Sequence, residues 1–278
     1  MTGSRRAHTP NSPVATASGV ARRGRYFENP TPTVLYISFN HDRPLFRGPG
    51  PAGNVRLKQA INYAIDRAAL IQVRTYGSAF AHDQLLPPSV PGFQEVALYP
   101  RRPNIERARR LAAGHTRNGN GLVYCDNGSV GEQQCKALEA MLRPIGLQLS
   151  RSHGCPSDCI QLPEHDLAFG GARPDHFDPS GFDSVDGAAI SFPRWRVRND
   201  ANFNHPAFNR RIRIARQLTG PRRNAAFGDL DADIMRTAAP LAVYGVSTER
   251  HYVSARVGCY HHHPFYGWDF PAICLRAG

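Results

Sequence analysis

The 278-residue sequence predicts an α/β fold, and three features of the chain support that prediction. Short runs of β-branched and aromatic residues alternate with segments whose apolar residues recur every three to four positions. The stretch 122–150 has the order strand, helix, strand with short loops, which is typical of a βαβ unit. Hydrophobic residues are 41% and charged residues 20% of the chain, which provides enough apolar material for a folded core.

The beginning of the chain differs in composition from the rest. Residues 1–24 are mostly Ser, Thr, Pro, Gly, Ala and Arg without a periodic apolar pattern, so we predict a disordered leader. Arginines are present there, but no apolar run follows them, so the segment lacks the pattern of a secretory signal peptide. The run at 34–40 is rich in β-branched and aromatic residues and is expected to be the first strand.

Two helices with polar N-cap residues are predicted after a Gly- and Pro-rich loop. Asn54 is expected to cap the first helix, which has an apolar stripe of 3.6-residue period. That period places Arg56, Lys58 and Asn62 away from the core. Asp66 is expected to cap the second helix.

The other predicted elements show the same signals of caps, periodicity and breaker residues. They are a helix at 104–113 capped by Asn104, a strand at 122–125, a long helix capped by Ser129, strands at 146–150 and 165–169, and helices at 206–218 and 221–237. Asp231 and Asp233 on the last helix are predicted to be surface charges. The chain from 241 to the end is expected to form strands and loops.

The formal net charge of +12 is the main argument for a nucleic-acid or anionic-surface binder, which is the alternative function. All but two of the 34 basic residues are arginine, a pattern that a GC-rich coding bias would produce. The arginines are scattered, without the basic stripe or aromatic spacing of nucleic-acid modules. We therefore expect no nucleic-acid partner.

Common catalytic and phosphate-binding motifs are missing from the sequence. It contains no GxxxxGK[ST], GxGxxG, GxSxG or HExxH segment. We expect no enzyme activity, no catalytic residue and no cofactor.

Two histidine-containing segments are candidate metal sites. His261, His262 and His263 stand together, but neighbouring residues on a strand point to opposite faces, so a solvated loop is the preferred interpretation. A zinc site at Cys155 and Cys159, with nearby His153, Asp158 and His165, is an alternative to a local disulfide or free thiols. We expect no metal at either place.

Six cysteines are compatible with three disulfides. Cys259 and Cys274 flank a Pro- and Gly-containing aromatic segment that can double back, so we predict a disulfide between them in an exported protein. Cys125 and Cys135 are a second predicted pair, which would join a strand end to the adjacent helix.

A loop with acids, aromatics and glycines follows the strand predicted at 165–169. It spans residues 170–182 and contains the sequence GGARPDHFDPSGF. Ligands of α/β proteins bind outside the carboxyl ends of strands, so the loop is well placed for a binding site. The alternative is a capped turn that begins at Asp178-Pro179.

Several segments, taken in order, resemble the C-terminal half of the family 5 extracellular solute-binding proteins, the peptide-binding subunits of ABC importers. The most recognisable is NVRLKQAINYAIDR at 54–67, followed by LPPSVPGF at 86–93 and Tyr99-Pro100. HDLAF at 165–169 with Asp178-Pro179 resembles the family's strand and DP turn. The resemblance covers about residues 25–278.

The resemblance implies a two-lobed, periplasmic-binding-protein-like clamp of type II, with this chain as its C-terminal lobe. Residues 25–240 would be the ligand-binding α/β lobe, and 241–278 would return to an N-terminal lobe that is missing here. The expected function is non-catalytic capture of a solute outside the cell for import through ABC permease subunits, with a peptide as the expected solute. A truncated chain, or a second polypeptide that supplies the other lobe, would explain the missing half.

One ligand contact is implied by the resemblance at residue level. Peptide-binding members hold the α-ammonium group of the ligand with an aspartate in a D-x-x-[DE]-P pattern. DHFDP at 175–179 matches that pattern, which makes Asp175 the expected anchor, with Phe177 and Asp178 as further ligand-binding residues. Many family members bind solutes other than peptides, so the ligand itself stays open.

Overall fold

The computed structural model describes residues 24–153, 164–174, 177–182, 201–263 and 265–276. The chain divides into two compact units. The larger unit is Pro32–Ser247, and the smaller unit combines Met1–Thr31 with Thr248–Gly278. The predicted leader at 1–24 lies outside the described residues except for its last residue, Gly24.

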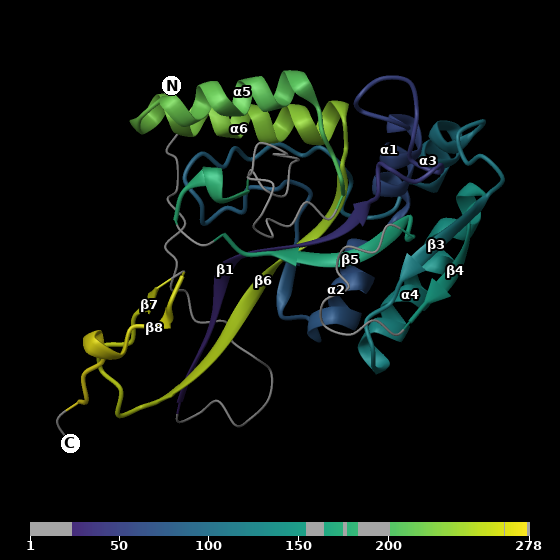
Figure 1. The fold of residues 1–278 in the computed structure, drawn as a ribbon. Coiled ribbons are helices and arrows are strands. Elements are labelled where there is room, and N and C mark those ends of the chain that lie inside the picture. The colour runs from purple at the N-terminus through teal and green to yellow at the C-terminus, as the bar shows by residue number, and fades with distance from the viewer. Residues whose placement is uncertain (1–23, 154–163, 175–176, 183–200, 264, 277–278) are drawn as a thin grey trace, which may run out of the picture. The chain divides into compact units, whose positions relative to one another are not determined.

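The larger unit is a mixed sheet with helices, which confirms the predicted α/β class (Figure 1). The sheet order is β2-β6-β1-β5-β3-β4. The strands are β1 (Gly24–Phe39), β2 (Ala79–Ala81), β3 (Asn120–Tyr124), β4 (Gln148–Ser152), β5 (Leu167–Ala172) and β6 (Leu241–Ser254), of which β1 and β6 continue into the smaller unit. The helices are α1 (Val55–Ala64), α2 (Arg67–Thr75), α3 (Ile105–Ala112), α4 (Ser129–Leu142), α5 (Pro206–Gln217) and α6 (Gly220–Thr237). Short 3-10 turns are η2 (Arg143–Ile145) and η3 (Pro179–Phe182).

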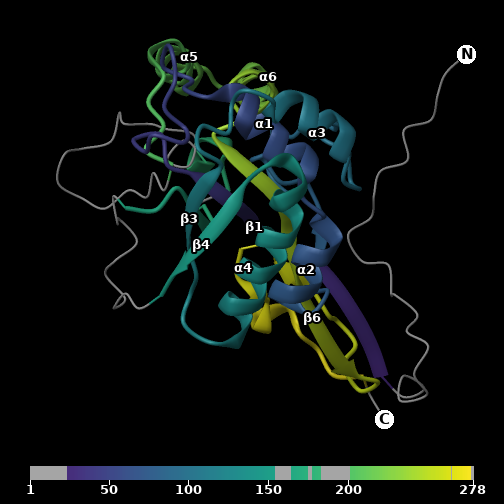
Figure 2. The same cartoon turned by 90° about the vertical axis from the view of Figure 1, so that its right-hand side faces the viewer.

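The two faces of β1 are both buried, and successive side chains alternate between two hydrophobic clusters. Leu35, Ile37 and Phe39 belong to the first cluster, which also holds residues of α1, α2, α3 and α4. Val34 and Tyr36 belong to the second cluster, together with residues of α5 and α6. The near-continuous apolar run of this strand follows from that double coverage. Figure 2 shows α2 and α4 side by side, and both contribute residues to the first cluster.

The predicted βαβ unit is present as β3, α4 and β4. Strands β3 and β4 pair in parallel, with Leu122 opposite Ser150. A disulfide between Cys125 and Cys135 joins the end of β3 to α4, which confirms the second of the two predicted pairings. The loop from β3 to α4 is thus closed covalently.

Three predicted N-caps are confirmed by side-chain hydrogen bonds. Asn54 accepts from the Leu57 amide, Asp66 from Ala69 and Asn104 from Arg107. The cap predicted at Ser129 was wrong, because Ser129 is the first helical residue of α4 and Gly128 holds the cap position with a φ of 104°. Glycine adopts that positive φ without the strain that a Cβ would add.

The prediction that Lys58 and Asn62 turn away from the core was wrong, whereas Arg56 is exposed as expected. Helix α1 is covered on more than one side, so its polar residues need internal partners. The Lys58 Nζ donates to the Ala52 carbonyl oxygen at 2.6 Å and lies 2.7 Å from His41 Nε2. Burial lowers the pKa of Lys58 to about 7.

Asp231 on α6 is also buried, which corrects its prediction as a surface charge. Its carboxylate accepts hydrogen bonds from the backbone amides of Leu85 and Leu86, at 2.9 and 3.1 Å. Burial raises the pKa of Asp231 to about 7, and the charge of Asp83 acts in the same direction, while the two amide bonds oppose the shift. Asp231 therefore ties a loop without regular structure to α6.

The described part of the smaller unit contains little helix. It consists of the first part of β1, the last part of β6, the hairpin of β7 (His262–His263) and β8 (Gly267–Trp268), and the turn η4 (Phe270–Ala272). A disulfide joins Cys259 to Cys274 and confirms the first of the two predicted pairings. Tyr260 stacks on Phe27 with ring centroids 4.2 Å apart.

The described helices lack a segment that is long and apolar enough to cross a lipid bilayer.

Candidate functional site

The candidate site begins at strand β5, which pairs antiparallel with β1. Gly170 lies opposite Tyr36, and a Cβ added to Gly170 would come within 2.5 Å of the Tyr36 ring. Because Tyr36 is buried, its ring has little freedom to move aside. Glycine at this position therefore lets the aromatic ring lie across β5 just before the loop.

The loop after β5 holds the three residues predicted to contact a ligand. Asp175, the expected anchor, lies outside the described residues. Pro174 before it is buried, and Phe177 after it is 48% exposed. The chain thus leaves the sheet at a buried proline and presents an aromatic side chain at the surface two residues after Asp175.

The carboxylate of Asp178 accepts four hydrogen bonds from Ser180 and Arg223. Its Oδ1 accepts hydrogen bonds from the Ser180 amide at 2.9 Å, the Ser180 hydroxyl at 2.6 Å and Arg223 Nη2 at 2.6 Å. Its Oδ2 accepts from Arg223 Nε at 3.2 Å. The two-pronged contact with Arg223 has the geometry in which guanidinium groups bind carboxylates most specifically.

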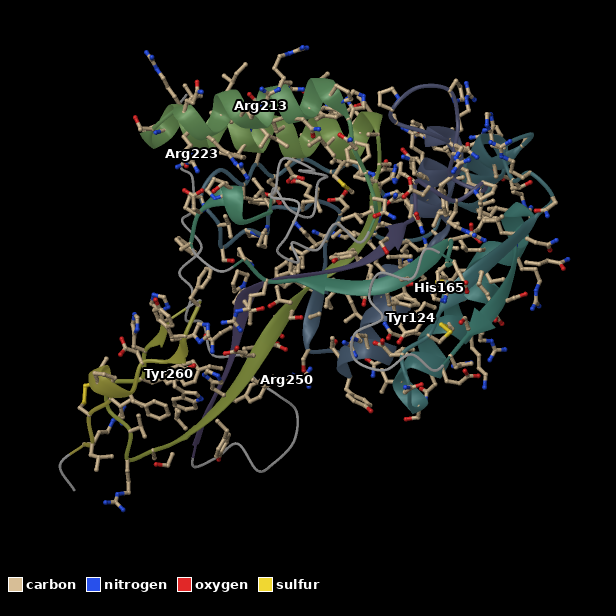
Figure 3. The ribbon with its side chains drawn as sticks, in the orientation of Figure 1. Tyr124, His165, Arg213, Arg223, Arg250 and Tyr260 are labelled. Atoms are coloured by element: carbon tan, nitrogen blue, oxygen red, sulfur yellow. A yellow bond between two sulfur atoms is a disulfide. The ribbon has the colours of Figure 1, made fainter. Side chains whose placement is uncertain are left out.

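Arg223 connects the loop to two helices. It lies in the first turn of α6, as Figure 3 shows, and its Nη1 donates to the carbonyl oxygens of Ala215 and Arg216 at the end of α5. Its guanidinium also lies over the Phe227 ring, 5.0 Å from the centroid. One side chain therefore fixes the end of α5, the start of α6 and the turn at Asp178.

The charge state of Asp178 follows from these contacts. Partial burial acts to raise its pKa, but the hydrogen bonds from Arg223 and Ser180 and the positive charge of Arg223 outweigh it. The pKa of Asp178 falls to about 2. Asp178 is thus ionised at neutral pH, with both oxygens engaged inside the protein.

Arg223 is a residue of the candidate site that the sequence did not reveal, although Asp178 matched a family pattern. The two residues are 45 positions apart in the chain, and no local signal links them. The prolines at positions 179 and 221 mark the two turns that Arg223 brings together, but they do not identify the partner.

Two surface hollows of the larger unit lie elsewhere. One, of about 460 Å³, is lined by residues that include Arg43, Arg117 and Asp166, and a second, of about 370 Å³, shares Arg117. Neither is lined by Phe177 or Asp178.

The two histidines of the alternative zinc site do not form one among the described residues. His153 Nε2 lies 3.3 Å from Glu132 Oε2, whereas the buried His165 packs against the Tyr124 ring (Figure 3). Neither belongs to a group of described residues close enough to hold a metal ion. Cys155, Asp158 and Cys159 lie outside the described residues.

Comparisons with known proteins agree with this architecture. The sequence profile of the bacterial extracellular solute-binding proteins, family 5 Middle, matches residues 7–184. A probable di/tripeptide-binding protein 5 from Pseudomonas aeruginosa (strain UCBPP-PA14) is 29% identical over 167 residues, which are 56% of this chain and 30% of that protein.

Solved structures share the fold at low sequence identity. HbpA2 from Haemophilus parasuis has a TM-score of 0.80 and 18% identity, with 92% of this chain and 50% of that chain covered. The dipeptide-binding protein from Pseudoalteromonas sp. SM9913, solved in complex with Met-Leu, has a TM-score of 0.69 and 21% identity, with 92% and 51% covered.

The chain spans about half the length of the solved structures and less than a third of the curated relative. The profile match extends over more than half of the chain. This chain belongs to the bacterial extracellular solute-binding proteins of family 5.

Proposed function

We propose that this chain captures a small peptide for import by an ABC transporter, without catalysis. The observation that supports the proposal best is the loop after β5, which carries the D-x-x-D-P pattern and is held by Arg223. Family membership supports solute binding. The names of the P. aeruginosa relative and of the Pseudoalteromonas complex point to di- and tripeptides.

The three loop residues have different roles in this proposal. Asp175 receives the α-ammonium group of the peptide, because a carboxylate in a partly desolvated cleft binds a cation strongly. Phe177 provides an exposed apolar surface for a ligand side chain. Asp178 contributes by holding the loop, since its oxygens already accept four hydrogen bonds from Arg223 and Ser180.

A second lobe completes the binding cleft in this proposal. The matched structures are about twice as long as this chain, so their folds include a half that this chain does not span. We propose that another part of the protein or a separate polypeptide supplies that half, and that the assembled clamp delivers its solute outside the cell to ABC permease subunits. The main chain of the peptide would be held by backbone pairing, with side chains in tolerant pockets.

The test is a four-way binding cycle on the 278-residue chain. Met-Leu and N-acetyl-Met-Leu are titrated into the parent and into Asp175→Asn, with chemical shifts as the readout for weak binding. We expect Met-Leu to bind the parent at least about 10-fold more tightly than the variant, which is about 1.4 kcal/mol. The acetylated peptide should bind both proteins weakly and equally.

Glu106→Gln is the matched control, because Glu106 is an exposed acid on α3, a helix that packs on α1 and η2, and its loss should leave binding unchanged. A coupling free energy below about 0.5 kcal/mol between Asp175 and the ligand amine would reject the ammonium anchor. Binding that requires no amine and falls steeply with salt would favour the anionic-ligand alternative.

A further inference from the structure

The smaller unit contains a group of three side chains whose ligand atoms lie close enough to hold a metal ion, and the proposed solute site does not use them. Glu249 and His251 lie two positions apart on β6, and His262 lies on β7. Side chains two positions apart on a strand point to the same face, so Glu249 and His251 share one side of β6. One carboxylate oxygen or ring nitrogen from each of the three residues lies within 4.8 Å of the other two.

His262 has an unusual environment for a histidine without a ligand. Both of its ring nitrogens are buried and lack a hydrogen-bond partner among the described residues. The Pro30 carbonyl lies near the ring, but no hydrogen bond of normal geometry joins them. Buried polar atoms of native proteins are almost always paired, so this ring is placed to bind something else.

His251 is held in a fixed orientation. It is buried, and its ring stacks on Trp268 with centroids 4.4 Å apart. Its Nδ1 lies 2.6 Å from the Tyr260 hydroxyl, which also accepts a hydrogen bond from Asn29 at 2.7 Å. Metal-binding histidines usually have such a partner on the second ring nitrogen.

The other nitrogen of His251 faces the carboxylate. His251 Nε2 lies 3.3 Å from Glu249 Oε2. When Nδ1 carries the proton and donates to Tyr260, Nε2 presents a lone pair to the carboxylate, and a cation between them removes the repulsion. Ligand atoms of a tetrahedral zinc ion with bonds of about 2.0–2.1 Å are about 3.3–3.4 Å apart, which matches this separation.

We propose that Glu249, His251 and His262 bind a divalent transition-metal ion of the zinc class, with Tyr260 orienting His251. Two imidazoles and one carboxylate are a donor set that suits zinc. Three protein ligands leave a fourth position for water or a solute atom. This site goes beyond the proposed peptide capture and lies within one unit of the chain.

The neighbouring histidines do not share the cluster. His261 Nδ1 lies 3.5 Å from Asp269 Oδ2, and His263 Nδ1 accepts hydrogen bonds from the amides of Phe265 and Tyr266. The expectation of a solvated loop was wrong for His262, which lies in β7 with buried ring nitrogens. The three consecutive histidines thus have different partners, and His262 is the one that joins Glu249 and His251.

Isothermal titration of Zn²⁺ into the disulfide-intact 278-residue chain tests the proposal. We expect one ion per chain at this site. Glu249→Gln keeps the size of the side chain and should weaken zinc binding more than 10-fold, as should His262→Gln. His261→Gln is the matched control on the adjacent residue and should change the affinity less than twofold.

Two further variants test the orientation of His251 and the contribution of the cysteines. Tyr260→Phe removes the partner of His251 Nδ1 and should weaken zinc binding about 10-fold. If His251 did not bind the metal, this substitution would leave the zinc affinity unchanged. Cys155→Ser with Cys159→Ser should leave the affinity unchanged. Far-UV circular dichroism and Trp268 emission report whether each variant is folded.

The proposal is overturned by any of three results in folded proteins. The first is that the parent does not bind zinc. The second is that Glu249→Gln and His262→Gln bind zinc as tightly as the parent. The third is that the cysteine double variant or His261→Gln loses zinc binding.

Discussion

The larger and smaller units of this chain are stabilised in different ways. The larger unit buries apolar side chains against both faces of its sheet, in two clusters. The described part of the smaller unit has two buried apolar side chains, Phe27 and Val253. In their place it has the Cys259–Cys274 disulfide and a set of stacked aromatic rings.

The difference shows how a short segment keeps a defined structure without a core of its own. Small folded units bury too little apolar surface to offset the loss of chain entropy, and disulfides or metal ions supply the missing stability. The smaller unit has the first of these devices and, in our proposal, the second. The stability of the larger unit is therefore expected to depend most on its buried apolar side chains. The stability of the smaller unit is expected to depend most on its disulfide.

The largest expected effect is a core truncation in the larger unit. Phe39 is completely buried, so Phe39→Ala should lower the free energy of unfolding by about 3–5 kcal/mol. Urea unfolding followed by far-UV circular dichroism measures the loss. Phe27→Ala in the smaller unit is the matched truncation. The free energy of unfolding measured from the loss of helical circular dichroism should stay within about 1 kcal/mol of the parent value. Equal losses in the two variants would contradict the distinction between the units.

Removal of the disulfide in the smaller unit should have the next largest effect. Cys259→Ser with Cys274→Ser opens a loop with a sequence separation of 15. Closing a loop of this length stabilises the folded state by about 3 kcal/mol in the chain-entropy model, so the double variant should lose that stability. Trp268 emission, measured in a Trp195→Phe background, should shift to the red at lower urea than in the parent. Helical circular dichroism should stay unchanged.

The matched control for that disulfide is Cys125→Ser with Cys135→Ser in the larger unit. It should lower the stability of the helical transition and leave Trp268 emission as it is. A change of Trp268 emission in this control would show that the two units do not respond separately.

A buried acid in the larger unit should produce a pH effect of moderate size. The folded-state pKa of Asp231 is about 7, above its unfolded value, so its stabilising contribution is complete at acidic pH and is lost as pH rises through about 7. The stability of the parent relative to Asp231→Asn should therefore decrease between pH 5 and pH 8, by at least about 1.4 kcal/mol. Urea titrations at the two pH values measure the difference, and a constant or increasing difference contradicts the assignment.

Asp178 should show the opposite pH dependence and the smallest effect. Its folded pKa of about 2 lies below the unfolded value, so its contribution is present above pH 4 and is lost as pH falls toward 2. Asp178→Asn should cost about 1 kcal/mol at pH 7, since the pair with Arg223 is partly exposed. Arg223→Lys keeps the charge but loses the two-pronged contact and should cost a similar amount. If neither variant lowered the free energy of unfolding, the proposal that Asp178 and Arg223 hold the loop would be contradicted.

Local signals in the sequence predicted much of the larger unit. The caps at Asn54, Asp66 and Asn104 and the helical periodicity depend on residues close in sequence, and these elements lie where expected. The strand β1 begins at Gly24, ten residues before the predicted start at position 34. The prolines at positions 30 and 32 argue against a strand, because proline cannot donate to a ladder.

Contacts between distant residues could not be predicted in the same way. The burial of Lys58 and Asp231 depends on backbone carbonyls and amides that other elements supply. Arg223 and the Glu249–His251–His262 group likewise depend on the tertiary arrangement. The pattern Glu-x-His on one strand was the available signal for the latter, and it identifies two of the three side chains.

Solute recognition belongs, in our proposal, to the larger unit, at the loop after β5. The most direct test is an amide chemical-shift map of the ¹⁵N-labelled chain during titration with Met-Leu. We expect shifts concentrated in residues 167–182 and around Arg223, absent in Asp175→Asn, with the amides of 248–276 unchanged. Shifts concentrated in 248–276, or an unchanged map in Asp175→Asn, would contradict the proposal.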